Sequence, residues 1–371
     1  MRSKWFILTA LIALPGTALA GLYESEAADF RITEVVDGLE HPWAVAFLPG
    51  GDLLVTERPG RLLRLDPEGD ERAAVDGLPE ITAERQGGLL DVVLHPEYAD
   101  NGWLYLSYVA ADDAGDQTTH VSRFRLDGTR LTDREDLFVA TPFTSGGRHF
   151  GSRLAFDGDH HLYITVGDRG DRDRAQDPQQ HIGKTVRLTD DGAIPGDNPF
   201  VAVDDAAPGL YTLGHRNAQG LARHPDTGAM WLHEHGPRGG DEINILEAGE
   251  NYGWPETTFG REYFGPRIGP EPPVDGFRPP IHHWTPSIAP SGMAFYTGDA
   301  FPEWQGDLFV GALAGTHLER LELDGDEVVH SETLLDHRSQ RIRDVRQGPD
   351  GALYLLVDSG SAPLLRIAPA Q

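Results

Sequence analysis

The sequence predicts an all-β fold, a six-bladed β-propeller of four-stranded antiparallel blades. A turn containing Gly or Asp followed by an apolar, β-rich run occurs six times along the chain. A second strand-like run precedes each copy, so the pattern describes six hairpins of one design. No long stretch has helical periodicity, and the 44 glycines and 27 prolines mark turns rather than helices.

The six hairpins follow one another along the chain. Their turn-and-strand segments are 51–55, 101–106, 160–164, 227–232, 306–310 and 350–355, and the preceding strands are 43–47, 90–94, 153–156, 219–222, 291–295 and 344–346. Further strand-like runs, as at 61–65 and 120–126, complete four-stranded sheets. The uneven spacing predicts insertions at 170–207 and 252–286, on the face that commonly builds the site. A two-domain sandwich remains an alternative, because short strands with turn signals are common to all β folds.

The N-terminus predicts a cleavable secretory signal over residues 1–20. Basic residues precede an apolar run at 5–14, and small residues follow, so cleavage is expected near Ala20 and one mature domain spans 21–371. The run is shorter than the roughly 20 apolar residues that a membrane helix needs. We therefore expect a periplasmic or secreted protein without a membrane anchor.

The chain contains no cysteine and is strongly acidic. Disulfides, thiolate catalysis and cysteine-ligated metal sites are thereby excluded. With 59 acidic and 31 basic residues, the formal net charge of −28 repels nucleic acid and anionic membranes. An anionic ligand must therefore be bound by a local cluster of arginines that overcomes the overall field.

His149 and Asp168 are the candidates for proton transfer. His149 lies in a Gly-rich loop before a predicted strand, and Asp168 ends the hairpin that follows, so both project from one end of the same blade. An imidazole can accept a proton near neutral pH, and a carboxylate on its other nitrogen fixes the tautomer and raises its basicity. Taken alone, the pair is also typical of a surface histidine and an ordinary turn.

Three arginines are expected to converge near the propeller axis. Arg216 lies with Asn217 in a loop between blades, whereas Arg341 and Arg343 alternate along a strand start and so point to one face. Three converging guanidinium groups would repel one another unless an anion lay between them. The sequence therefore predicts an anion site, with a solvated charged rim as the competing interpretation.

Two further patterns resemble metal sites only superficially. The acidic loop 168–173 lacks the glycine and the terminal glutamate of an EF-hand, so we interpret it as a solvated loop. His233 with His235, and the pair 282–283, have spacings that zinc could use. Unpaired histidine sets are more often packing or surface residues.

Several motifs occur together in a fixed order. They are Gly214-His215-Arg216-Asn217-Ala218-Gln219-Gly220 and the segments 86–90, 147–153, 167–168, 235–244, 251–255 and 341–345. In this combination the chain resembles the soluble quinoprotein sugar dehydrogenases from His41 to its C-terminus. The resemblance implies oxidation of the C1 hydroxyl of aldoses to lactones with pyrroloquinoline quinone (PQQ) and calcium (Ca2+). Electrons would then leave to an external acceptor, a quinone or a cytochrome.

The resemblance also implies residue roles. His149 is the general base, Asp168 its orienting partner and Arg216 the group that polarises the quinone carbonyl. The residues implied to contact the cofactor are Gln86, His149, Arg216, Asn217, Arg341 and Arg343. The sugar is expected against Gln86 and Trp284, although a tryptophan in the core is an equal competitor.

Calcium ligands are implied in the same way. The Gly236-Pro237 turn exposes successive carbonyls, oxygen donors that suit calcium, although such a turn alone is a weak signal. The resemblance implies that these carbonyls and the cofactor hold one calcium ion. It implies that Glu242 and the Tyr252 carbonyl hold a second, structural one.

One position departs from the family pattern. Where relatives often carry a lysine that contacts a cofactor carboxylate, this chain has Ala314. Either the cofactor binds more weakly, or His317 or Arg320 supplies the missing charge.

Two other functions are compatible with a propeller. A calcium-dependent lactonase also uses a histidine and carboxylates around an axial metal, but it does not need the three arginines. A non-catalytic sugar-binding propeller would not be expected to retain His149 and Arg216, which are both present.

Overall fold

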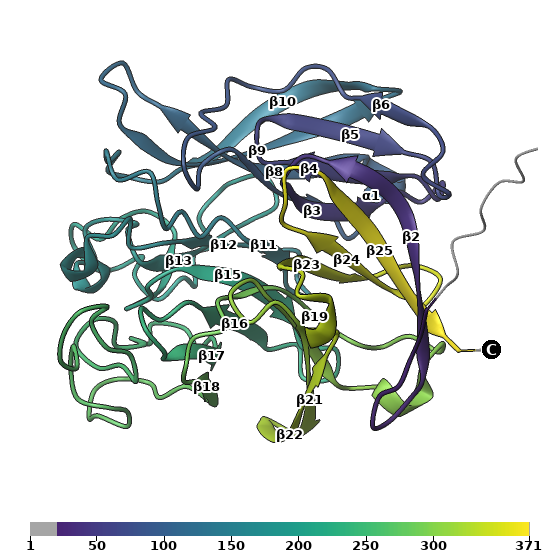
Figure 1. The fold of residues 1–371 in the computed structure, drawn as a ribbon. Helices are drawn as coiled ribbons and strands as arrows, with labels where there is room; N and C mark the ends of the chain where they lie inside the picture. The colour runs from purple at the N-terminus through teal and green to yellow at the C-terminus, as the bar shows by residue number, and fades with distance from the viewer. Residues whose placement is uncertain (1–20, 371) are drawn as a thin grey trace, which may run out of the picture.

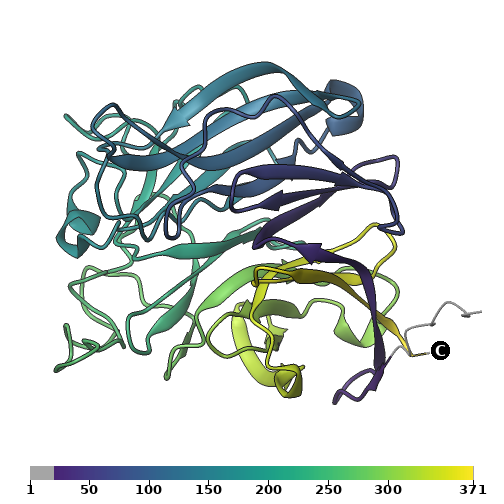
Figure 2. The same ribbon diagram turned by 45° about the horizontal axis from the view of Figure 1, so that its top comes forward.

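Six antiparallel sheets surround a common axis in the computed structural model, which describes residues 21–370 (Figure 1). The innermost strands β3, β7, β11, β15, β19 and β23 contact one another in a closed circle. The predicted six-bladed propeller is therefore confirmed, and the closed circle excludes the two-domain sandwich. Figure 2 shows the same blades from a second direction.

Each blade is a consecutive run of strands, except at the closure of the ring. Blade 1 consists of β3 (Pro42–Phe47), β4 (Leu53–Glu57), β5 (Arg61–Leu65) and β6 (Arg72–Ala74). Blade 2 consists of β7 (Leu89–Leu94), β8 (Trp103–Ala111), β9 (Gln117–Asp127) and β10 (Arg130–Val139). Blade 3 consists of β11 (Leu154–Phe156), β12 (Leu162–Val166), β13 (Lys184–Leu188) and β14 (Leu210–Leu213). Blade 4 consists of β15 (Ala218–Arg223), β16 (Met230–Glu234), β17 (Asp241–Ile245) and β18 (His282–Trp284). Blade 5 consists of β19 (Pro290–Phe295), β20 (Leu308–Ala312), β21 (Leu318–Asp324) and β22 (Glu327–Leu334). Blade 6 consists of β23 (Ile342–Gln347), β24 (Leu353–Val357) and β25 (Ala362–Pro369), together with the N-terminal strands β2 (Phe30–Leu39) and β1 (Gly21–Tyr23).

Helical structure within 21–370 is limited to single turns. These are α1 (Tyr98–Asn101) and the 3₁₀ turns η1 (Arg172–Gln176), η2 (Pro302–Trp304) and η3 (Asp336–Arg338). Among these residues no helix is long and apolar enough to cross a membrane. The predicted signal peptide lies outside the described residues.

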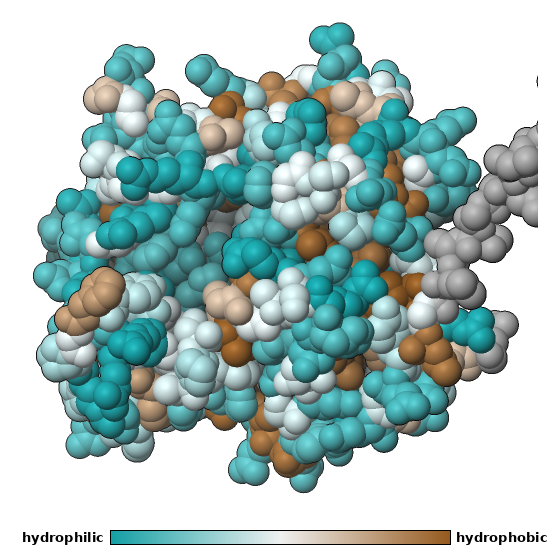
Figure 3. Space-filling view, in the orientation of Figure 1, coloured by the Kyte–Doolittle hydropathy of each residue, from teal (hydrophilic) through white to brown (hydrophobic). Residues whose placement is uncertain are grey.

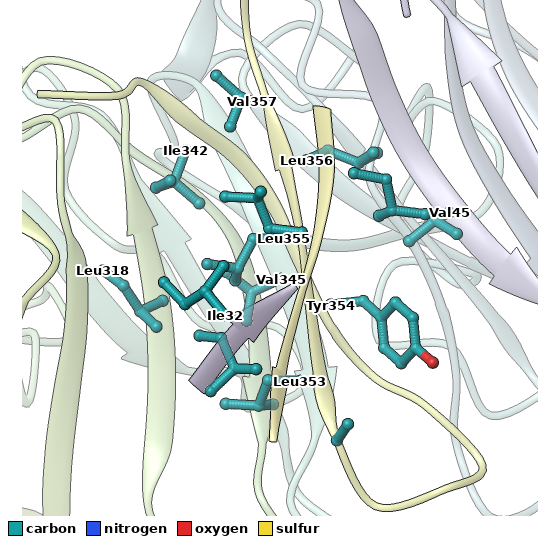
Figure 4. Close-up of a cluster of buried hydrophobic side chains, with 14 of the residues drawn as sticks. Ile32, Val45, Leu318, Ile342, Val345, Leu353, Tyr354, Leu355, Leu356 and Val357 are labelled. Atoms are coloured by element: carbon teal, nitrogen blue, oxygen red, sulfur yellow. The ribbon is translucent and has the colours of Figure 1, made fainter. Parts of the chain in front are cut away.

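An N-terminal strand closes the ring. β2 pairs with β25 in an antiparallel register that runs from Phe30 opposite Pro369 to Leu39 opposite Ala362. In Figure 1 the purple β2 lies beside the yellow β25. Ile32 of β2 packs in a buried cluster with Val345 and Leu355 of blade 6 (Figure 4), so apolar burial joins the first and last strands of the described chain to one blade.

The face of the molecule drawn in Figure 3 is mostly hydrophilic. Figure 3 shows a face on which polar and charged side chains predominate and apolar residues are scattered. This surface agrees with the acidic composition.

A buried charge network lies between the inner strands of the blades. Asp91 of β7 and Asp344 of β23 are both shared by Arg153 and Arg346, with N–O distances of 2.8 to 3.3 Å. The amides of Leu154 and Val45 also donate to these carboxylates. The network therefore ties together blades 1, 2, 3 and 6.

The predicted insertions are only partly correct. β13 lies inside the segment 170–207, and β18 lies inside the segment 252–286. β18 has only three residues, whereas β13, with five, is as long as predicted strands such as β4. The true long loops are 189–209 and 246–281, and the second supplies a residue of the site.

We expect Arg153→Leu to lower the free energy of unfolding by about 3–5 kcal/mol, because two buried carboxylates lose a shared cation. Arg267→Leu is the control, since Arg267 forms a half-exposed pair with Glu271 and its loss should cost less than about 1 kcal/mol. Urea unfolding followed by tryptophan fluorescence measures both. Equal midpoints for the two variants would contradict a stabilising role of the network.

Candidate active site

Loops from several blades enclose a cavity of about 570 Å³. The predicted residues that line it are Gln86, His149, Arg216, Asn217, Gly236, Pro237, Ala314, Arg341 and Arg343. Residues separated by more than 250 positions in the sequence therefore meet at one site. Asp168 lies directly behind His149 rather than on the wall.

His149 and Asp168 form the expected pair. The Nδ1 of His149 is 2.6 Å from Oδ1 of Asp168, and the two side chains are 14% and 2% exposed. The His149 backbone has a left-handed φ of 52°, and its amide donates to Oε1 of Gln86 at 2.7 Å. With the Nδ1 proton directed at the carboxylate, Nε2 is the nitrogen that can accept a proton.

Burial changes the expected basicity of this pair. Desolvation lowers the pKa of His149, and the charge of Arg216 acts in the same direction, against the hydrogen bond that the imidazole donates to Asp168. The expectation that the carboxylate raises the basicity of His149 is thus outweighed by burial. The lowered pKa keeps the imidazole neutral near pH 7, as a general base requires.

Asp168 remains ionised although it is buried. Burial opposes its charge, but the His149 bond, the Arg216 charge and the Gly170 amide together hold its pKa below the usual value. The prediction of a solvated loop at 168–173 is wrong at its start, because Asp168 and Arg169 are 1% and 4% exposed.

Trp254 is a residue of the site that the sequence did not assign. Its indole N–H donates to Oδ2 of Asp168 at 2.9 Å, and its ring lies 5.4 Å from the Arg216 guanidinium carbon. Backbone bonds to Gly214 and from Gln176 anchor it. Although Trp254 belongs to one of the recognised motifs, a buried tryptophan is typical of a core residue, so only the contact shows its role.

Arg216 is held by backbone oxygens. Its Nη1 donates to the carbonyls of His235 and Gly236, each at 2.9 Å. In the described chain no carboxylate lies within 4.0 Å of this guanidinium group. The Gly236 carbonyl, an expected calcium ligand, therefore already accepts one hydrogen bond and retains its second lone pair for a cation.

Arg341 and Arg343 share a carboxylate of the protein itself. Asp358 lies 3.3 Å from each guanidinium group and 2.9 Å from Nδ1 of His41. Burial opposes the charge of Asp358, yet Arg343, His41 and Arg341 lower its pKa to about 2. The anion that the arginine cluster required is thus partly internal, a feature that the sequence analysis missed.

A smaller cavity of about 10 Å³ adjoins the main one and is lined by Glu234, Glu242 and Tyr252. Burial and the neighbouring Glu234 charge hold the pKa of Glu242 well above its usual value. A space of this size holds one water or ion, and carboxylate and carbonyl oxygens are the donors that calcium prefers. The residues present therefore fit the second calcium ion, and Glu234 is an unpredicted neighbour of it.

Trp284 is not on the cavity wall. It is 8% exposed and packs with Met293 and Phe295 in the core between blades 4 and 5. The structure therefore supports the competing interpretation of a core tryptophan.

Neither candidate for the missing lysine reaches the cavity. Arg320 is held by Asp307 at 2.6 Å and Glu332 at 2.8 Å, and His317 is held by Glu319 at 2.9 Å. These ion pairs hold both side chains against carboxylates of blade 5, away from the cavity. Ala314 itself lines the cavity, so no basic group replaces the lysine from this strand.

The histidines suggested as zinc ligands point to separate surroundings. His233 is fully buried, whereas Nε2 of His235 contacts the Pro290 carbonyl at 2.5 Å. His283 stacks on Phe259, and His282 packs edge-on against Trp284. Residues 21–370 contain no group of three or more metal-binding side chains of the His, Cys, Asp and Glu types.

Comparisons with known proteins identify the family. The family model described as "Glucose / Sorbosone dehydrogenase" matches residues 39–366. Aldose sugar dehydrogenase YliI of Escherichia coli is 44% identical over the full length of both chains. The crystal structure of a soluble aldose sugar dehydrogenase from E. coli in the apo form is 44% identical, covers 92% of this chain and 100% of its own, and has a TM-score of 0.89.

A more distant structure adds a cofactor-bound example. The PQQ-bound aldose sugar dehydrogenase of Streptomyces coelicolor is 29% identical, covers 93% of this chain and 99% of its own, and has a TM-score of 0.76. With a family model that matches nearly the whole described chain, this protein belongs to the glucose/sorbosone dehydrogenase family.

Proposed function

We propose that this protein oxidises the C1 hydroxyl of aldose sugars to lactones with PQQ and calcium, and passes the electrons to an external acceptor. The observation that carries the proposal is the convergence of the His149–Asp168 pair and Arg216 with Arg341 and Arg343 in one cavity. The E. coli relative is named an aldose sugar dehydrogenase, and the S. coelicolor relative binds PQQ.

The cavity suits a polycarboxylate cofactor. Arg341 and Arg343 offer guanidinium groups for carboxylates, and Asn217 and Arg216 lie beside them on the wall. The carbonyls of Gly236 and Pro237 would hold the calcium ion that accompanies the cofactor. When bound, PQQ supplies the electrophilic carbonyl carbon that accepts a hydride.

The protein residues provide proton transfer and charge. His149 accepts the C1 hydroxyl proton at Nε2 while the C1 hydrogen leaves as hydride. Asp168 keeps the Nδ1 proton in place, and the Trp254 N–H fixes the second oxygen of that carboxylate. Arg216 places its charge where negative charge develops during the transfer.

The charge distribution favours a dehydrogenase over a lactonase. A lactonase would surround its metal with carboxylates, whereas the only carboxylate among the residues that line the main cavity is Asp358, which is paired with arginines. A non-catalytic sugar-binding protein has no need for a buried His149–Asp168 pair. The predicted leader at 1–20 would deliver the enzyme to the periplasm or the medium.

Replacing His149 with alanine should separate binding from chemistry. Quinone binding should stay within a few-fold, while sugar-dependent turnover falls about 10²-fold or more, the usual scale for removing a positioned base. The measurement is a fluorescence titration with PQQ in calcium, then single-turnover reduction by glucose, with NAD as the negative cofactor control. A reduction rate close to that of the parent would mean that another group accepts the proton.

Trp254→Phe should move the acid limb of the pH profile of kcat/KM upward. Without the indole N–H, the Asp168 carboxylate becomes more basic and holds the Nδ1 proton of imidazolium more tightly, so the pKa of His149 rises. Trp231→Phe is the control, because Trp231 is also buried and no partner of its N–H is found in the described chain. An unchanged acid limb in Trp254→Phe would exclude the positioning role.

Glu242→Gln should remove most of the calcium-dependent rise in melting temperature, because a cation bound only by the native state stabilises it by mass action. In calcium-free buffer the variant should instead be more stable than the parent. The raised pKa of Glu242 means that the parent loses stability as pH rises through that pKa, and the amide removes this loss. Differential scanning fluorimetry with calcium or EGTA tests both; equal calcium shifts in parent and variant would exclude Glu242 as a ligand.

A further inference from the structure

The main cavity carries far more positive charge than the proposed cofactor needs. Its walls contain six arginines and a single carboxylate, Asp358, in a protein with 59 acidic and 31 basic residues. The arginines are Arg58, Arg85, Arg216, Arg238, Arg341 and Arg343. The walls thus hold five net positive charges, and three cofactor carboxylates reduce this to two. One calcium ion raises the net charge to four, so with a neutral sugar bound the cavity would keep this positive charge uncompensated.

Three of these arginines have no role in the proposed chemistry. We call Arg58, Arg85 and Arg238 the arginine collar. Over residues 21–370 none of the three has a carboxylate within 4.0 Å, whereas Arg61, Arg64 and Arg174 on the outer surface are ion-paired at 2.6 to 3.0 Å. In an acidic protein, arginines that remain free of carboxylates around one cavity are available to an external anion.

The backbone holds two members of the collar together. Arg58 donates from its side chain to the carbonyl of Arg85, whose φ of 52° is left-handed. Gly88 lies so close that a Cβ would be 1.9 Å from the Arg58 carbonyl oxygen, so the approach requires glycine there. Arg85 also precedes Gln86, which accepts a hydrogen bond from the His149 amide.

Arg238 approaches from another blade beside an aromatic residue. It lies in the loop after β16, directly after the Gly236-Pro237 turn, and its Nη1 is 3.5 Å from the carbonyl of Tyr263. Tyr263 also lines the cavity and is 57% exposed. A charged residue and an exposed aromatic residue on the wall of one cavity suit a ligand with one acidic end and one apolar face.

We propose that the arginine collar binds the acid group of an anionic small molecule that reacts in this cavity. The observations favour an aldose with a carboxylate or phosphate remote from C1, such as a uronic acid, because Arg85 adjoins the residue that supports the base and Tyr263 offers a face for the sugar ring. The inference rests on the proposed function. The acid group is unchanged in the reaction, since only the C1 hydroxyl proton and the C1 hydride leave the sugar. An anionic electron acceptor would use the same charges.

The test compares two sugars that differ only at C6, where one carries a carboxylate and the other a neutral hydroxymethyl group. Galacturonate and galactose are oxidised with a neutral quinone acceptor by the holoenzyme and by Arg85→Gln and Arg238→Gln. In each variant the ratio of kcat/KM for galacturonate to that for galactose should fall about tenfold or more, the scale of one charge-assisted hydrogen bond. High salt should shrink the same ratio in the parent. Arg223→Gln is the control, because Arg223 is exposed, lacks a carboxylate partner in the described residues and lies outside the cavity.

A second arm identifies the source of the anion. With galactose as substrate, ferricyanide and the neutral quinone are compared as acceptors. A selective loss with ferricyanide alone would assign the collar to the acceptor, whereas a selective loss with galacturonate assigns it to the sugar. Equal changes for charged and neutral reactants in both arms would overturn the proposal.

Failure of the proposed function would give a different result, because the parent would then oxidise neither sugar in the presence of PQQ and calcium. In that case calorimetric titration of the protein with galacturonate and galactose still tests the collar. Weaker galacturonate binding in the collar variants than in Arg223→Gln supports it, and equal binding overturns it.

Discussion

The buried network of Arg153 and Arg346 with Asp91 and Asp344 is the constraint on which the rest of the structure depends. In the low-dielectric interior each carboxylate needs its arginines, so the inner strands of separate blades must keep one relative position. The network also reaches the site. Arg153 lies 4.1 Å from the ring of Trp43, which lines the cavity, and donates to the carbonyl of Gln219, whose side chain accepts from Arg343.

Charge is therefore arranged in two different ways along the same molecule. Between the inner strands every arginine of the network is matched by a buried carboxylate, which fixes geometry and leaves no charge for a ligand. In the cavity the arginines outnumber the carboxylates, and this excess is available for binding. The overall charge of −28 makes the contrast functional, because an anion is repelled by most of the surface and attracted at one opening.

The sequence predicted the features that depend on local pattern. The six hairpins were found because each inner pair repeats a turn and an apolar run, and His149, Arg216, Arg341 and Arg343 lie in recognisable motifs. The misses depend on long-range contact. Trp254 meets Asp168 across 86 positions, and Asp91 meets Arg346 across 255. The sequence left Trp284 open between the sugar site and the core, because an aromatic residue near a site looks the same in sequence whether it faces the cavity or the core.

The electrostatic design of the site also explains why its base is buried. Arg216 must remain charged to stabilise developing negative charge, yet that same charge acts on His149 and disfavours protonation of the imidazole. Burial has the same sign, so both effects keep the base neutral before the reaction. Asp168 opposes these two effects. Its buried carboxylate accepts three hydrogen bonds and lowers the free energy of the imidazolium that forms as the sugar loses its proton. The base is thus free to accept a proton at neutral pH and is stabilised once it has done so.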